Sequence, residues 1–257
     1  MKPTYYFPLL AALFIFVGCS QSENYDILIK NGQIVDGSGT LSYIGDVGIN
    51  ADTIAAVGDL GDATGTQEID ATGLAVAPGF INMLSWATES LIEDGRSMAD
   101  IKQGVTLEVF GEGWSMGPLN ESMKKQEQES QGDIQYDIEW NSLNEYLEYL
   151  TTKGVSPNVA SFVGATTLRI NMVGYEDRAP TPQEMDSMKL MVKQAMEEGA
   201  LGVGSSLIYA PAFYSSTDEL IELCKVAAEY DGMYISHMRS EGSRLLESLD
   251  ELVQIPD

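Results

Sequence analysis

The sequence predicts an α/β protein of about five strand–helix units with a parallel sheet, preceded by a small β-sandwich segment. Two observations support this. Short strand patterns lie between Gly and Asp clusters throughout residues 23–76, as in a β-sandwich or open barrel. Apolar strand patterns then alternate with amphipathic helix patterns over residues 77–257, which implies a parallel sheet. A closed barrel needs roughly 90 to 120 further residues. An open five-stranded sheet and the front part of a barrel therefore both fit.

The composition excludes one class of partner. The 257 residues include 39 acidic and only 14 basic side chains, for a net charge of −25. Nucleic-acid phosphates require Lys and Arg, so we expect no nucleic-acid partner. The hydrophobic fraction of 44% is that of an ordinary globular protein. The two cysteines, Cys19 and Cys224, stand in unrelated contexts and predict no disulfide framework.

Residues 1–22 have the pattern of an export signal. Lys2 precedes an apolar run, Tyr5–Val17, that is too short to favour a membrane-spanning helix. The ending Phe16–Cys19 resembles a bacterial lipobox, and by that resemblance Cys19 carries lipid. We therefore expect an exported lipoprotein, periplasmic or held at the outer membrane through this anchor alone. An uncleaved anchor or a plain signal peptide is the alternative.

The first folded segment, residues 23–76, is expected to be structural. Its strand patterns are Tyr25–Lys30, Gln33–Val35, Gly45–Asn50, Thr53–Val57 and Leu74–Val76. A turn at Asn31-Gly32 separates the first two patterns. No cluster of titratable residues in this segment suggests chemistry.

The second segment, residues 77–257, supplies the alternating units. Strands are predicted at Pro78–Leu84, Gly104–Phe110, Val155–Val163, Ala200–Ser206 and Met233–Ser236. Helices are predicted at Glu139–Thr152, Thr181–Glu198, Ser216–Tyr230 and Glu241–Val253. Thr181 is a suitable N-cap and Gly199 a suitable C-terminal stop. Ser216 and Glu219 have the spacing of a capping box.

His237 is the only histidine of the chain, and it stands where the last predicted strand ends. A polar residue at the carboxyl end of a strand that leads into a helix lies where α/β enzymes place their chemistry. From spacing alone, a histidine packed or hydrogen-bonded at a strand end remains the plainer alternative.

Four stretches together resemble a known family. Tyr25–Gly39 and Ile69–Ile81 are similar to the opening of the amidohydrolase superfamily. Within that superfamily, Gly199–Tyr209 and Met233–Gly242 resemble the N-acyl-D-amino-acid deacylases, or D-aminoacylases. The resemblance implies a metal-dependent hydrolase of linear, non-peptide C–N bonds. It also implies that the five strand–helix units form an incomplete (β/α)8 barrel, and not an open sheet. The sandwich would be built only partly from the first segment, and the chain would form the N-terminal part of a longer protein.

The resemblance places two metal ligands in this chain. His237 occupies the position of the histidine that ends the family's fifth barrel strand. Phe110–Pro118 aligns with the run that holds the ligand of the second strand, and Glu112 replaces a cysteine there. A carboxylate is a competent zinc ligand, although a harder one than a thiolate. Together with a residue of the sixth strand, these two imply one divalent ion, Zn²⁺. The alternative for Glu112 is a solvated loop glutamate.

The chain departs from the superfamily at the first and third strands. The first strand of the superfamily ends in His-x-His, but Leu84 and Trp86 stand at those positions here. Ala165 stands where the family often has a histidine after glycine. None of these side chains offers a lone pair to a metal. We therefore expect the metal position that depends on the first strand to be lost.

The implied reaction is metal-assisted hydrolysis of a small N-acyl amino acid. The family's general base is an aspartate late in the barrel, which would lie beyond residue 257, so no catalytic residue is assigned in this chain. Tyr209 matches a family tyrosine near the substrate and could hydrogen-bond the acyl carbonyl. Trp86 and Trp114 could wall the pocket, although either is equally plausible as an ordinary core aromatic.

Arg239 is the fourth candidate for substrate binding. Its guanidinium could pair with a substrate carboxylate or, structurally, with Glu241, and we favour the structural use.

Two other functions stay open at this point. The residues at Leu84, Trp86 and Ala165 suggest a catalytically inactive barrel kept for binding or as a scaffold. A different C–N hydrolase, acting on a cyclic amide or a dipeptide, would use the same fold. A histidine on the sixth strand would favour a hydrolase. The 257-residue chain by itself is expected to be inactive, because five strands leave an open sheet edge and an incomplete metal shell.

Overall fold

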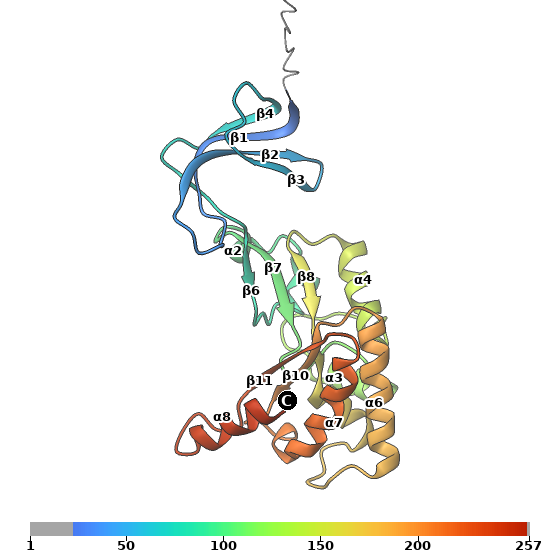
Figure 1. Cartoon of the computed structure of the whole chain (residues 1–257). Coiled ribbons are helices and arrows are strands. Elements are labelled where there is room, and N and C mark those ends of the chain that lie inside the picture. Colours follow the sequence, from blue (N-terminus) through green and yellow to red (C-terminus); the bar gives the residue numbers. More distant parts are fainter. Residues whose placement is uncertain (1–22, 256–257) are drawn as a thin grey trace, which may run out of the picture. The chain divides into compact units, whose positions relative to one another are not determined.

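The computed structural model describes residues 23–255. Cys19 and the predicted export signal lie outside the described residues. The chain divides into two compact units, Met1–Pro78 and Gly79–Asp257, and each is described by itself (Figure 1). Within the described range, no helix combines the length and the apolar character needed to cross a membrane.

The first unit is built on one five-stranded sheet. Its strands are β1 (Asn24–Ile34), β2 (Tyr43–Asn50), β3 (Thr53–Gly58), β4 (Thr64–Asp70) and β5 (Ala75–Val76). The order is β3-β2-β1-β4, and β5 also pairs with β1. Tyr25, Leu28 and Ala63 form its small core. The described strands make a single layer, so the second layer of a sandwich stays a prediction.

The predicted break in the first strand is wrong. β1 continues through Asn31-Gly32, and its register against β2 shifts between Ile29 and Gly32. Asn31 takes a left-handed φ of 60°, which asparagine tolerates better than most residues. Its N–H donates to Asp46 Oδ1 at 2.9 Å. The Asn-Gly pair therefore forms a bulge inside one long strand instead of a turn between two strands.

The second unit contains the predicted parallel strands. They are β6 (Phe80–Asn82), β7 (Val105–Phe110), β8 (Asn158–Ser161), β9 (Val163–Gly164), β10 (Gly202–Ser206) and β11 (Met233–His237). The pairings run β6-β7-β8 and β9-β10-β11, and every one is parallel. Only Phe162 separates β8 from β9, and its N–H donates to the carbonyl of Phe110 at 2.9 Å. The carboxyl ends of neighbouring strands therefore lie at the same edge.

Helices follow the strands in the order expected. They are α1 (Ser90–Glu93), α2 (Met98–Ile101), α3 (Glu121–Ser130), α4 (Leu143–Lys153), α5 (Ala165–Met172), α6 (Pro182–Glu197), α7 (Thr217–Ala228) and α8 (Leu245–Gln254), with a 3-10 turn, η1 (Ala212–Tyr214). The helices predicted at α4, α6, α7 and α8 are confirmed, with shifted ends. Thr181 and Glu184 form the capping box that starts α6. Four short helices, α1, α2, α3 and α5, were not predicted.

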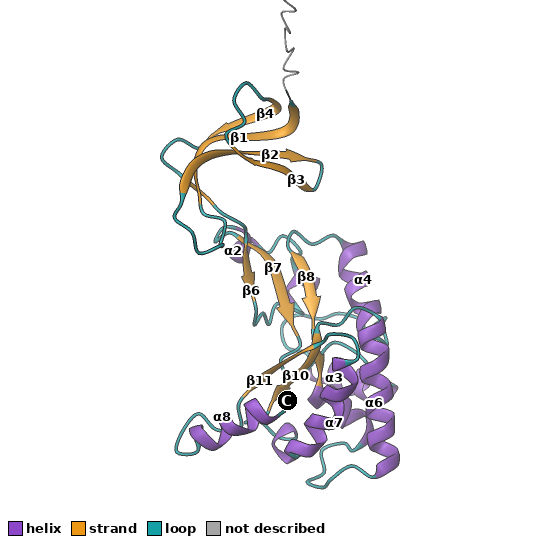
Figure 2. Cartoon of the chain, viewed as in Figure 1, coloured by secondary structure: helices purple, strands orange, loops and turns teal. Residues whose placement is uncertain are grey.

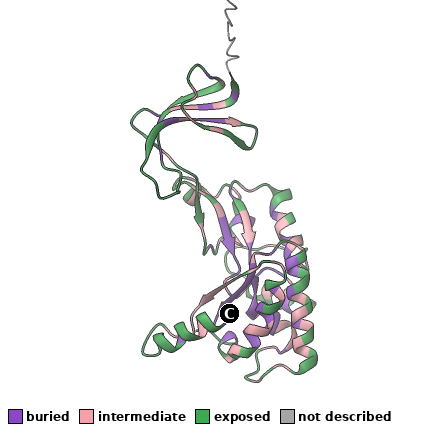
Figure 3. Ribbon diagram, viewed as in Figure 1, coloured by how far each residue is buried: buried purple, intermediate pink, exposed green. Residues whose placement is uncertain are grey.

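The core of this unit lies between the strands and the helices. Helices α4, α6 and α7 lie on the same side of β7, β8 and β10 (Figure 2). The buried residues concentrate between them (Figure 3), and Trp140, Tyr146 and Leu168 are among the largest that are fully enclosed. This packing fixes the helix-facing side of the sheet.

The capping box predicted for α7 is only half formed. Ser216 accepts a hydrogen bond from the N–H of Glu219 at 3.1 Å, as predicted. The carboxylate of Glu219 does not complete the box, because it is buried against Arg169 at 2.8 Å and also accepts from Ser215 Oγ at 2.9 Å. Glu219 therefore links α7 to α5 instead of capping its own helix.

Candidate metal and substrate site

Glu112 and His237, the two predicted metal ligands, both lie close to Ser206, and the charge of His237 acts on the Glu112 carboxyl. Ser206 ends β10 and stands opposite His237 in the parallel register with β11. Its hydroxyl donates a short hydrogen bond to the backbone carbonyl of Glu112 and lies 3.5 Å from Glu112 Oε2. The structure therefore gathers the ends of three strands at one place and brings the two predicted ligands together.

Two glycines allow the chain to approach so closely at Glu112. Gly111 and Gly113 have φ angles of 95° and 124°, a region that side chains with a Cβ rarely adopt. A Cβ on Gly113 would lie 2.5 Å from Ser206 Oγ. A Cβ on Gly111 would lie 2.1 Å from the carbonyl oxygen of Phe162. The flanking glycines are therefore required both by backbone conformation and by space.

The carboxyl of Glu112 is partly removed from water. Burial raises its pKa above the ordinary value, and the nearby Glu241 raises it further. The charge of His237 and the hydroxyl of Ser206 act in the opposite direction but do not cancel the effect of burial. A carboxylate in this setting is stabilised by added positive charge, which a bound cation would supply.

His237 is contacted by two residues from different directions. Its Nε2 lies 3.3 Å from Glu241 Oε1, and its side chain is 23% exposed. The ring of Tyr209 meets the imidazole edge-on, with centroids 5.3 Å apart and an interplanar angle of 82°. Glu241 was predicted as a structural partner of Arg239 and instead contacts His237. The spacing of four residues between them was the only signal in the sequence.

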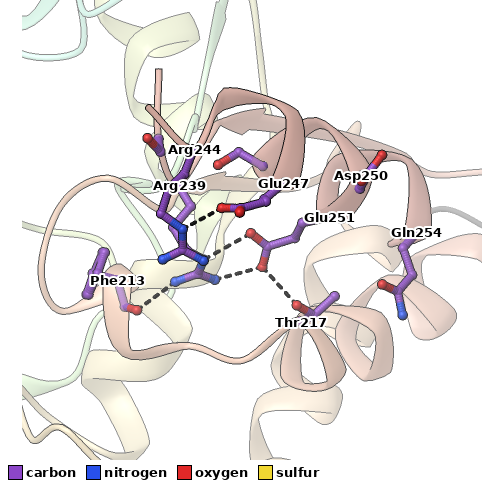
Figure 4. Close-up of a pocket in the computed structure, with 10 residues that line it drawn as sticks. Phe213, Thr217, Arg239, Arg244, Glu247, Asp250, Glu251 and Gln254 are labelled. Carbon is purple, nitrogen blue, oxygen red and sulfur yellow. Dashed lines mark hydrogen bonds and ion pairs between the residues drawn. The ribbon is translucent and has the colours of Figure 1, made fainter. Parts of the chain in front are cut away.

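Arg239 is paired with Glu251, so the predicted pairing with Glu241 is wrong. Its Nε donates to Glu251 Oε2 at 2.9 Å, and its Nη2 donates to Oε1 at 2.8 Å (Figure 4). The guanidinium also donates to the backbone carbonyls of Phe213 and Ser215. Glu251 lies on α8, one turn of helix beyond Glu247, and nothing in the local sequence indicated which acid would reach Arg239.

The residues that follow β6 differ from those at the ends of β7 and β11. Leu84 and Trp86 are exposed at 48% and 62%, and neither could bind a metal. Ser85 lies between them and points inward, where its hydroxyl donates to the fully buried Glu108 at 2.6 Å. Trp114 is partly buried and packs against the core. The Ser85–Glu108 bond was not predicted, because nothing in the sequence indicates that the two meet.

Comparison with known proteins gives a consistent result, although no family model matches the chain. D-aminoacylase from Alcaligenes xylosoxydans xylosoxydans is 34% identical over 240 residues, which are 92% of this chain and 49% of the relative. N-acyl-D-aspartate deacylase from the same organism is 30% identical over 232 residues, 90% of this chain and 46% of the relative. The chain is homologous to the N-acyl-D-amino-acid deacylases. It spans about half the length of the curated relatives it matches.

Solved structures of these deacylases have the same fold. A crystal structure of D-aminoacylase matches with a TM-score of 0.79 at 31% identity, covering 90% of this chain and 49% of that one. N-acyl-D-glutamate deacylase from Bordetella bronchiseptica, complexed with zinc and a phosphonate that mimics the tetrahedral intermediate, also gives 0.79 at 30% identity, covering 91% and 49%. The predicted amidohydrolase resemblance and α/β class are confirmed.

The deacylase homologue described here offers a metal two donors. Glu112 and His237 supply a carboxylate oxygen and an imidazole nitrogen, both of which zinc accepts. Within residues 23–255, no group of three or more His, Cys, Asp or Glu residues is arranged to hold a metal ion. Ala165, at the start of α5, is buried and offers no donor. The two donors fit a divalent cation that takes its further ligands from elsewhere.

Proposed function

We propose that this chain forms the metal-binding half of a hydrolase that deacylates N-acyl-D-amino acids at their linear amide bond. The observation that carries the proposal is the convergence of Glu112 and His237 at Ser206. It occurs in a chain homologous to enzymes named D-aminoacylase, N-acyl-D-aspartate deacylase and N-acyl-D-glutamate deacylase. Those names favour a linear N-acyl amino acid over a cyclic amide or a dipeptide, and an enzyme over an inactive scaffold.

We further propose that the parallel strands β6 to β11 are the first five strands of a (β/α)8 barrel, with β8 and β9, which only Phe162 separates, forming one barrel strand. The parallel order supports this, because each strand is followed by a helical connection to the next. The relatives are about twice as long as the matched region. The general base, a third metal donor and the rest of the sandwich would then come from residues that follow Asp257.

In this proposal Glu112 and His237 hold one divalent cation, Zn²⁺. When bound, such a cation supplies Lewis-acid chemistry: it polarises the amide carbonyl and acidifies a water molecule. Ser206 orients Glu112 through its hydroxyl. The absence of donors at Leu84 and Trp86 supports one ion at this end of the barrel instead of two.

Tyr209 and the tryptophans would shape the substrate site. The ring of Tyr209 stands beside His237 and is 60% exposed, so its hydroxyl is free to donate to the acyl carbonyl or the developing oxyanion. Trp86 presents an exposed aromatic surface at the end of β6, and Trp114 follows Glu112 at the end of β7. The guanidinium of Arg239 is occupied by partners within the chain, which argues against direct binding of a substrate carboxylate.

The site of action is a separate proposal. The resemblance of Phe16–Cys19 to a lipobox supports an exported lipoprotein held at the periplasmic side of a bacterial membrane. Intact-mass analysis of a membrane fraction tests this, because a mature chain starting at Cys19 should carry the mass of the attached lipid. An unmodified Cys19 would contradict it.

The proposed activity is tested on the whole protein expressed from its gene. Release of free amino acid should be measured from N-acyl-D-amino acids, with the matched L-enantiomers as the control. We expect hydrolysis of the D-series that disappears in the Glu112→Ala and His237→Ala variants together with bound zinc. Residues 23–257 alone should be inactive. No turnover of any N-acyl amino acid by zinc-loaded whole protein would refute the deacylase function.

A further inference from the structure

Arg239 joins three segments that are separate in the sequence. Besides its two bonds to Glu251 on α8, its Nη1 donates to the carbonyl of Phe213 at 2.7 Å (Figure 4). Its Nη2 also donates to the carbonyl of Ser215 at 2.8 Å. Thr217 Oγ1 donates to Glu251 Oε1 at 2.9 Å and so fixes the acceptor. The planar fork of a guanidinium sets both distance and angle in such an arrangement, which an ammonium does not.

These bonds lead directly to the candidate site. The N–H of Phe213 donates to the carbonyl of Tyr209 at 2.8 Å. The N–H of Leu207 donates to the carbonyl of His237 at 2.9 Å. His237 precedes Arg239 by two residues. The backbone from Leu207 to Phe213 is therefore held at one end by the strand that carries His237 and at the other end by Arg239.

Tyr209 depends on this arrangement because its own side chain is weakly packed. It is 60% exposed, and its one described ring contact is with His237. A half-exposed ring keeps its position only if the backbone beneath it is fixed. We propose that Arg239 is a positioning residue, which holds the Leu207–Ser215 segment so that the Tyr209 ring stands against the His237 imidazole. This inference rests on the proposed function only because that proposal gives Tyr209 and His237 their roles in the reaction.

Arg244 provides a matched control. It lies five residues further along and lines the same groove, where its Nε donates to Glu247 at 2.5 Å (Figure 4). Its side chain is 69% exposed, and the bonds described for it do not reach the Leu207–Ser215 segment. Replacing Arg244 removes the same charge from the same groove without cutting a link to Tyr209.

His237 makes the geometry directly measurable. The measurement uses NMR of the whole, metal-free protein with a histidine-free tag, and the imidazole C–H signals of His237 are identified as those that the His237→Gln variant lacks. An aromatic ring held edge-on to the imidazole displaces those signals by its ring current. Tyr209→Leu defines the signal position without the ring. We expect Arg239→Gln to move the His237 signals most of the way to that position, Arg239→Lys to move them part of the way, and Arg244→Gln to leave them in place.

A second variant distinguishes a displacement of Tyr209 from a general loss of structure. Arg239→Gln leaves the carboxylate of Glu251 without its arginine partner, so Arg239→Met combined with Glu251→Gln removes both charges. The inference is overturned if either variant keeps the wild-type circular dichroism and the wild-type His237 signals. Because this measurement uses neither metal nor substrate, it stands whether or not the protein proves to be a deacylase.

The kinetic consequence is measured on the whole protein. A small displacement of Tyr209 is expected to reduce kcat/KM by roughly tenfold to a hundredfold, mainly through kcat, because misplaced groups cost more in the transition state than in the ground state. Arg239→Lys should recover part of the loss, and Arg244→Gln should match the wild type. Equal losses in Arg239→Gln and Arg244→Gln would contradict a positioning role for Arg239 while leaving the deacylase function intact.

Discussion

The ends of neighbouring parallel strands in this protein differ sharply. After β7 and at the ends of β10 and β11, Ser206 contacts Glu112 and stands opposite His237 in the strand register, and the charge of His237 acts on Glu112. At the end of β6, Leu84 and Trp86 are exposed and offer nothing to a metal. This edge of the fold therefore carries two candidate metal donors after β7 and at the end of β11, whereas Leu84 and Trp86 after β6 offer none. In the proposed function, each metal position depends on residues from its own strands, so one position can be lost while the other is kept.

Two glutamates of the same stretch, Glu108 and Glu112, stand in contrasting surroundings. Glu108 on β7 is fully buried, and each of its oxygens accepts a serine hydroxyl at 2.6 Å, from Ser85 and Ser97. Glu112, four residues on, is partly buried, and its pKa is raised because burial outweighs its neighbours' help. A carboxylate with its own donors is structural, whereas a desolvated one beside an imidazole is available for a cation.

The largest expected effect is removal of the ligands at β7 and β11. Glu112→Ala and His237→Ala in the whole protein should each lose bound zinc and hydrolytic activity, because too few donors remain for a catalytic zinc site. Leu84→Ala, at the end of β6, should keep its zinc. Metal content by mass spectrometry after dialysis checks all three. Zinc retained by both ligand variants, or lost from Leu84→Ala, would contradict the assignment of the metal to Glu112 and His237.

The next largest effect concerns the ion pair that links α5 to α7. Arg169 and Glu219 are 0% and 2% exposed at the side chain, and Arg169 also donates to two backbone carbonyls. Arg169→Met leaves Glu219 buried and uncompensated, at a cost of about 3–5 kcal/mol in the free energy of unfolding. The double variant Arg169→Met with Glu219→Leu should recover most of that stability.

Glu108→Gln is the corresponding change at the buried glutamate of β7, which accepts the hydroxyl of Ser85. An amide can still accept one of the two serine hydroxyls, so we expect a smaller loss of about 1–3 kcal/mol. Urea unfolding of Arg169→Met, of the double variant and of Glu108→Gln measures how much the Arg169–Glu219 ion pair and the serine bonds to Glu108 each contribute to stability. A larger loss for Glu108→Gln than for Arg169→Met would show that the serine pair, and not the ion pair, is the stronger support.

Gly113→Ala tests how closely β10 must approach Glu112. Its Cβ would lie 2.5 Å from Ser206 Oγ and 2.9 Å from the backbone nitrogen of Ser206, at a φ of 124°. We expect a cost of about 1–3 kcal/mol and weaker zinc binding, because the added carbon pushes Glu112 away from β10. Gly132→Ala, with nothing within 4 Å of the new carbon, is the control. Unchanged zinc affinity in Gly113→Ala would mean that contact with Ser206 does not set the ligand position.

Local sequence patterns predicted the frame of this site. The Thr181 N-cap, the alternation of strands and helices, and His237 at a strand end all depend on residues close together in the chain, and the structure contains each of them. Local patterns alone could not predict that Glu112 lies near His237, because the two residues are 125 positions apart in the sequence. That prediction also required the family resemblance. Local propensity together with the resemblance therefore predicted which two candidate ligands lie close together, while their role as ligands stays a prediction.

The missed features depend on contacts that no local pattern encodes. The bulge at Asn31 forms because Asp46, on the next strand, accepts its N–H. The side chain of Glu219 leaves its capping box for an arginine 50 residues earlier. Glu251 pairs with Arg239 only because α8 places it there, whereas Glu241, closer in sequence, contacts His237. In each case a distant partner competes with the local interaction and displaces it.

The smallest expected effect is the pH dependence that Glu251 adds to this part of the molecule. Burial by itself would raise the pKa of Glu251, but the hydrogen bonds from Arg239 and Thr217 outweigh it and hold the pKa below the ordinary 4.5. A carboxyl whose pKa is lower in the folded state contributes stability above its unfolded pKa. That contribution is lost as the pH falls through 4.5 and below, because the unfolded chain takes up the proton first.

Wild-type protein should therefore lose stability faster than Glu251→Gln between pH 6 and about pH 3, by at most the uptake of one proton. Other carboxyls with a lowered pKa, such as Glu184 and Glu222 at about 2, contribute equally to both proteins and cancel in the difference. Urea unfolding across this range measures that difference. Parallel curves would mean that Arg239 does not hold Glu251 ionised, and the segment that carries Tyr209 would then be fixed by the backbone bonds to Phe213 and Ser215 alone.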